Sequence, residues 1–128
     1  MTKRRWDELE WFCRDFFKGS YHQWHTIIDD YHQNFAQIDI QCLNLTEDTF
    51  HETFQRVCKT LFNLCRSSSN GYVIAMLGFA VRINEYHRLR KSPWYKLDIL
   101  INSMTSVLEE ETDFNPKQFA TATFCILL

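Results

Sequence analysis

Histidine and cysteine are the residue types of this chain best suited to catalysis or metal binding, and there are five of each. His22 and His25 are three residues apart, so one face of a helix would bring both side chains to the same metal ion. His32 lies a further seven residues along, and no neighbouring cysteine or carboxylate has the spacing of a zinc site. The chain also has no glycine-rich phosphate loop and no nucleophile elbow. We therefore expect no catalytic site, metal or cofactor, and no enzymatic activity.

The cysteines are odd in number and show no CxxC spacing, and the N-terminal residues MTKRRWDELEW contain no apolar signal segment. Both features favour a reducing compartment, where thiols act as small core residues. The sequon at Asn44-Leu45-Thr46 is then expected to stay unglycosylated. The five cysteines are Cys13, Cys42, Cys58, Cys65 and Cys125.

The last four residues, Cys125-Ile126-Leu127-Leu128, match the pattern for prenylation of a cysteine. The alternative is that these apolar side chains belong to the core face of a last helix. We favour the core interpretation, because that helix has few other apolar residues to bury. Lipidation of Cys125 remains the alternative.

Composition favours a helical fold in one domain, residues 1–128. Aromatic residues make up 16% of the chain, whereas there are only three glycines and two prolines to form turns. The formal net charge of −2 gives no basic field, so nucleic acid is not an expected partner. At this length a single core can be stable without disulfides or metals.

The stretch from Ser67 to Tyr86 contains the most apolar segment of the chain. Its short polar residues predict a helix that begins at or near Gly71. No polar stripe appears before Arg82 and Asn84, which is typical of a helix surrounded by other helices. About a dozen apolar residues are too few to cross a membrane. We expect the buried central helix of a small bundle, with no transmembrane anchor.

Amphipathic segments with apolar residues every three or four positions flank this stretch. The connector Ala36–Leu45 could be a short helix, a strand-like piece or irregular, and we favour irregular. The bundle should contain six to eight helices, and an apolar groove between them is plausible. The predicted flanking helices are Trp6–Phe17 ending near Gly19, Tyr21–Phe35, a helix opened by Thr46 and running through Phe50 to Cys65, one opened by Ser92-Pro93 and ended by Glu109–Glu111, and one opened by Asn115-Pro116.

Two stretches resemble the Bcl-2 family of apoptosis regulators. The run Ser69-Asn70-Gly71-Tyr72, with the aliphatic residues and Phe79 that follow, resembles the NWGR motif that opens the family's central helix. Leu43 to Phe62 is similar to the segment that enters and forms the family's fourth helix. The resemblance covers Tyr21 to Leu108 and implies an all-α, Bcl-2-like helical bundle with a buried central helix.

Within the second predicted helix, Trp24, Ile28, Asp29 and Tyr31 fall at the key positions of a BH3 motif. Trp24 and Ile28 replace the motif's Leu and small Gly, so this helix should be a structural part of the fold rather than a ligand. The short length, the sequence divergence and the lack of a C-terminal anchor resemble the compact homologues of large DNA viruses such as iridoviruses and poxviruses.

The resemblance implies a viral apoptosis inhibitor that sequesters the BH3 helix of pro-apoptotic proteins such as Bim in a hydrophobic groove. Tyr72 stands where the family has an Arg that pairs with the ligand's Asp, and its hydroxyl offers one donor without charge. We expect narrower or weaker binding, unless Arg56 or Arg66 supplies the cation. Matching positions assign these residues to the groove: Tyr31, Phe35, Phe54, Val57, Leu61, Gly71, Tyr72, Ala75 and Phe79.

The resemblance leaves an alternative of the same fold, a viral protein that blocks innate immune signalling by binding an adaptor. A homodimer is a further expectation, because surplus aromatics at Trp6, Trp11 or the groove face could pair two copies. The expected location is the host cytoplasm, either free or peripheral at mitochondria.

Overall fold

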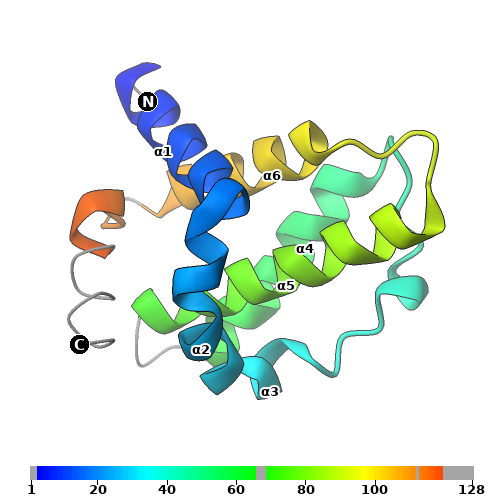
Figure 1. Ribbon diagram of the computed structural model, residues 1–128, viewed down its shortest axis with the longest axis horizontal. Helices are drawn as coiled ribbons and strands as arrows, with labels where there is room; N and C mark the ends of the chain where they lie inside the picture. Colours follow the sequence, from blue (N-terminus) through cyan, green and yellow to red (C-terminus); the bar gives the residue numbers. More distant parts are fainter. Residues whose placement is uncertain (1–2, 66–68, 112, 120–128) are drawn as a thin grey trace.

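A computed structural model describes residues 3–65, 69–111 and 113–119, and every regular element in those ranges is helical (Figure 1). The predicted all-α class is thus confirmed for this part of the chain. The elements are α1 (Lys3–Asp15), the π-helix η1 (Phe16–Ser20), α2 (Tyr21–Asp30), α3 (His32–Phe35), the 3₁₀-helix η2 (Ile40–Leu43), α4 (Phe50–Leu64), α5 (Ser69–Arg90) and α6 (Leu97–Glu110).

Helix α5 is the buried centre of the bundle, as predicted. Every residue from 71 to 80 is buried, and the helix contacts α2, α3, α4 and α6. Figure 1 shows it crossing the middle of the molecule. It begins at Ser69, two residues before the expected start, and ends at Arg90. The next residue, Lys91, has a positive φ of 53°, which lets the Ser92 N–H donate to the His87 carbonyl oxygen at 3.3 Å.

The first two helices are joined without a break, so the predicted end near Gly19 is wrong. Gly19 does not adopt the positive φ that ends many helices, and the widened turns of η1 carry the chain from α1 into α2. The predicted helix Tyr21–Phe35 is instead interrupted at Tyr31. The N–H of Tyr31 donates to the carbonyl oxygen of Ile28 at 3.0 Å, a tightened last turn that separates α2 from the four-residue α3.

Helix α4 begins later than the Thr46 signal predicts. The hydroxyl of Thr46 accepts from the Thr49 N–H and the hydroxyl of Thr49 accepts from the Thr46 N–H, each at 3.2 Å. This reciprocal pair forms a turn before the helix, which starts at Phe50. The connector expected to be irregular contains η2, which is capped by the Asp39 carboxylate accepting from the Gln41 N–H at 3.1 Å.

Helix α6 begins at Leu97, so the predicted start at Ser92-Pro93 is also wrong. The Ser92 hydroxyl hydrogen-bonds the His87 imidazole at 3.0 Å, and its N–H caps α5, so this residue is already used at the end of the preceding helix. The end at Glu110 agrees with the prediction. The Asn115 cap is confirmed, since its side-chain oxygen accepts from the N–H groups of Lys117 and Gln118 at 3.0 and 3.1 Å.

The two ends of the described chain are held together. The Arg5 guanidinium donates to the carbonyl oxygens of Leu108, Glu111 and Phe114 at 3.4, 2.8 and 3.1 Å, which joins α1 to the end of α6. A cluster of aromatic rings lies beside this contact, with centroids 5.0 to 6.0 Å apart; its members are Phe12, Phe16, Trp24, Phe114 and Phe119. The end of the bundle where α6 stops is therefore well fixed.

Candidate functional site

The residues assigned to the groove are brought together, but inside the core. Tyr31 is partly buried, and the other eight are buried. Phe54 and Phe79 have no exposed surface and stack with their ring centroids 5.7 Å apart. Leu61 and Ala75 are likewise fully buried. A ligand helix would reach this set only after covering side chains or helices had moved.

Helix α3 covers part of α5 through one close approach. The ring of Phe35 lies against Gly78, where an added Cβ would overlap the ring, and the Arg82 guanidinium donates to the Phe35 carbonyl oxygen. Because only glycine leaves room for this ring, α3 is seated directly on the central helix.

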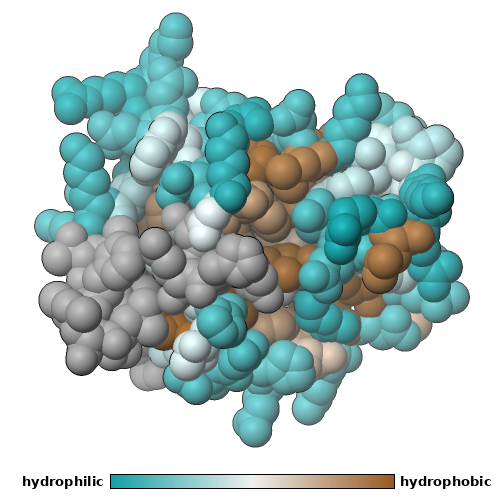
Figure 2. All heavy atoms as spheres, in the orientation of Figure 1, coloured by the Kyte–Doolittle hydropathy of each residue, from teal (hydrophilic) through white to brown (hydrophobic). Residues whose placement is uncertain are grey.

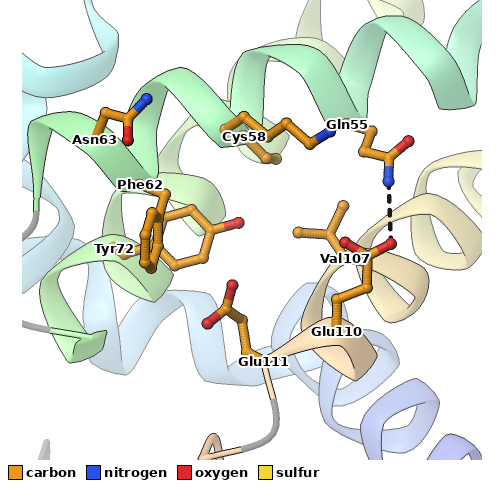
Figure 3. Close-up of a pocket in the computed structure, with 9 residues that line it drawn as sticks. Gln55, Cys58, Phe62, Asn63, Tyr72, Val107, Glu110 and Glu111 are labelled. Carbon is orange, nitrogen blue, oxygen red and sulfur yellow. Dashed lines mark hydrogen bonds between the residues drawn. The ribbon is translucent and has the colours of Figure 1, made fainter.

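Tyr72 lines a pocket of about 350 Å³ between α4, the first turns of α5 and the end of α6 (Figure 3). Figure 3 shows the hydroxyl of Tyr72 and the carboxylate of Glu111 pointing into the pocket. The rings of Phe62 and Tyr72 meet edge to face, with centroids 5.3 Å apart. The lining residues are Gln55, Cys58, Lys59, Phe62, Asn63, Tyr72, Val107, Glu110 and Glu111.

The Tyr72 hydroxyl and the Cys58 thiol, which both line the pocket, are neutral at pH 7. The Tyr72 hydroxyl shares a hydrogen bond with the Cys58 thiol, and burial raises the pKa of both groups well above their usual values. Proximity to Cys58 and Glu111 raises the pKa of Tyr72 further. A thiol with a raised pKa is a poor nucleophile, so Cys58 acts here as a core residue.

The end of α6 supplies negative charge. Burial, then the nearby carboxylates of Glu110 and Asp113, raise the pKa of Glu111 above its ordinary value. Gln55 on α4 donates from Nε2 to Glu110 Oε1 at 3.0 Å, a contact drawn in Figure 3. A carboxylate whose pKa is raised by neighbouring carboxylates marks a place where a cation would be favoured.

Replacing Glu111 with glutamine is expected to stabilise the chain at neutral pH. Because the pKa of Glu111 is higher in the folded than in the unfolded chain, its contribution to stability is present in acid and is lost as the pH rises through the folded pKa. We expect Glu111→Gln to raise the free energy of unfolding at pH 7 by less than about 1 kcal/mol, as is usual for partly solvated charges. Urea unfolding at several pH values measures this.

The gain should shrink as the pH falls through the raised pKa of Glu111, and it should vanish below 4.5, the ordinary carboxyl value, where Glu111 is neutral in both the folded and the unfolded chain. Glu109→Gln is the matched control, since it removes the same charge from the same turn outside the pocket lining. A loss of stability at pH 7 in Glu111→Gln, with Glu109→Gln unchanged, would contradict this assignment.

The three groups proposed to meet a ligand's Asp are placed differently. Tyr72 is 3% exposed and faces the acidic pocket, whereas Arg56 is exposed on α4. Arg66 lies outside the described residues. Cys125 does too, so its burial in the core and the alternative, its lipidation, both stay predictions. Sequence reasoning missed Glu110 and Glu111 as pocket residues, because a run of acids at a helix end is usually solvated.

Apolar side chains also reach the surface, and Figure 2 shows apolar areas separated by hydrophilic ones on the face it presents. Trp11 is 67% exposed, whereas Trp6 is only partly exposed. Among the residues whose side chains the structure describes, the exposed large apolar ones are Trp11, Phe62, Leu64, Leu89 and Leu97. The expected homodimer through such residues stays a prediction.

Two features of the described ranges concern metal binding and the membrane. No group of three or more His, Cys, Asp or Glu residues there could hold a metal ion. None of the helices described is both long and apolar enough to cross a membrane. The cysteines Cys13 and Cys58 are buried free thiols, Cys65 is buried, and Cys42 is an exposed free thiol.

Comparison with known proteins gives no match, whether to a protein-family model, to a curated protein or to a solved structure. The function must therefore be inferred from the sequence motifs and from the geometry.

Proposed function

We propose that this chain is a Bcl-2-like viral inhibitor of apoptosis, which binds the amphipathic BH3 helix of pro-apoptotic proteins. One observation carries the proposal: the run that resembles the NWGR motif lies at the start of α5, which is buried among α2, α3, α4 and α6. A Bcl-2-like protein needs this placement, since the motif then adjoins both the central helix and α4.

The ligand would enter by displacing α3. A helix of four residues has little stability of its own, and α3 is held mainly by its seat on α5. Its departure would uncover the surface of α5 around Gly78 and the adjoining part of α4. An amphipathic helix that presents apolar residues at every third or fourth position could cover that surface, the helix-in-groove mode of recognition.

Calorimetric titration of BH3 peptides into the purified protein tests the proposal. We expect at least one peptide of a full panel, Bim included, to bind, with lower affinity or narrower selectivity than an arginine at position 72 would permit. Each peptide should be paired with a variant in which a central apolar anchor is replaced by glutamate, which should abolish binding. No heat from any peptide, with circular dichroism showing a folded protein, would refute the proposal.

A second candidate has one observation in its favour. Because the assigned groove residues are buried, a Bcl-2-fold protein of this kind could act through its outer surface, as an inhibitor that binds an adaptor of innate immune signalling. Direct binding of a purified adaptor, together with no binding to any BH3 peptide, would favour this candidate over the first.

A further inference from the structure

The pocket beside Tyr72 combines apolar walls with groups that accept hydrogen bonds. Phe62, Tyr72 and Val107 supply the walls, and Glu110 and Glu111 supply carboxylates at one side (Figure 3). A long side chain with an apolar stem and a polar head matches this layout, since the stem can lie along the walls while the head meets the carboxylates.

The hydrogen-bond acceptors of the pocket, the Tyr72 hydroxyl oxygen and the Glu111 carboxylate, favour a ligand group that only donates hydrogen bonds. Tyr72 is more than nine-tenths buried, and the Cys58 thiol that shares its hydrogen bond is a weak partner, so the hydroxyl oxygen keeps a lone pair for a stronger donor. With the Glu111 carboxylate it forms a pair of oxygens directed into the pocket. Lysine and arginine have only donors in their side-chain heads, so they fit where an acceptor would not.

The charge of the pocket favours the same ligand. Lys59 is among the lining residues, so one cation faces two carboxylates. The charged groups that act on Glu111 are nevertheless the acids Glu110 and Asp113, and both raise its pKa. The Arg5 guanidinium donates to the backbone carbonyl oxygen of Glu111 at 2.8 Å. A ligand cation at the Glu111 carboxylate inside the pocket would lower the pKa of that carboxylate and partly neutralise its charge. The rings of Phe62 and Tyr72 add a surface suited to a guanidinium.

We propose that this pocket binds the side chain of an arginine or lysine on a partner's helix. The inference rests on the proposed function and adds the charge of the partner's side chain. The resemblance implies a positive residue on the protein and a negative one on the ligand, and the arrangement proposed for this pocket is the opposite. Where an arginine would accept a ligand's aspartate, this chain places Tyr72 beside two glutamates, which repel a carboxylate.

An NMR titration with ethylguanidinium tests the pocket itself, with propionate as an anionic probe. We expect ethylguanidinium to shift amide signals in residues 55–63, 72 and 107–111 with millimolar affinity, and propionate to leave them unchanged. Glu111→Gln should weaken the binding about tenfold, and the control Glu109→Gln should change it less than twofold. Equal shifts with propionate, or undiminished binding to Glu111→Gln, would overturn the inference.

Two BH3 peptides that differ only at the conserved aspartate, kept in one and changed to arginine in the other, then test the partner. The arginine peptide should bind at least tenfold more tightly, and this preference should fall below threefold in Glu111→Gln. If ethylguanidinium binds but neither peptide does, the helix-binding function and the assignment of a partner helix both fail. If both peptides bind equally and ethylguanidinium does not bind, the pocket inference alone fails.

Discussion

Replacing Phe79 with alanine is expected to lower the free energy of unfolding by about 3–5 kcal/mol, the range for deleting a fully buried phenylalanine. The side chain lies in the middle of α5, has no exposed surface, and stacks on Phe54 of α4. Its removal leaves a cavity between the two helices that the surrounding rings cannot fill without leaving their own packing. Urea unfolding followed by circular dichroism measures the loss.

Leu89→Ala is the matched control, because Leu89 lies on the same helix and is 75% exposed. It should change stability by no more than about 0.5 kcal/mol. If Phe79→Ala does not fold, Phe79→Leu should still fold with a smaller loss. Equal stabilities for Phe79→Ala and Leu89→Ala would mean that α5 is not the core helix.

Replacing Gly78 with alanine should destabilise the chain even though alanine is the better helix former. The gain in helix propensity is about 1 kcal/mol, whereas forcing a methyl group into a filled core costs about 1–3 kcal/mol. The added Cβ would overlap the ring of Phe35, so α3 must shift away from α5. We expect a net loss of stability, and Gly78→Ala with Phe35→Leu should lose less than the two single losses combined.

Gly19→Ala is the control, because a Cβ at that position meets nothing within 4 Å and should stabilise the helix.

The Gly78→Ala variant should also change the binding of a ligand helix. If a ligand helix must displace α3, loosening α3 lowers the cost of that step, so a BH3 peptide should bind Gly78→Ala more tightly than the parent. Weaker peptide binding by this less stable variant would argue against displacement of α3.

The sequence predicts the helices best where apolar periodicity alone decides. The apolar run of α5 and the periodic face of α4 predict burial correctly, because both patterns depend on how much apolar surface a helix must hide. The errors fall where a local signal serves another purpose. Ser92 caps the end of α5 instead of opening α6, and the Thr46 hydroxyl pairs with Thr49 in a turn before α4.

The candidate site depends on contacts between helices that no local pattern encodes. The position of Tyr72 in the sequence marks it as important, but its neighbour Glu111 is 39 positions away and joins it only through the packing of α6 against α4. Burial of the assigned groove residues is likewise a tertiary property. Phe35 is among the residues assigned to the groove, but it is buried here because Gly78 leaves room for its ring against α5.

Amide hydrogen exchange of the protein, alone and with a saturating BH3 peptide, tests the helix-binding proposal most directly. The proposal predicts slower exchange in residues 50–64 of α4 and 71–79 of α5, together with faster exchange in residues 32–35 as α3 is displaced. A bound peptide that leaves these segments unchanged, or that slows exchange only in α1 and α6, would contradict it.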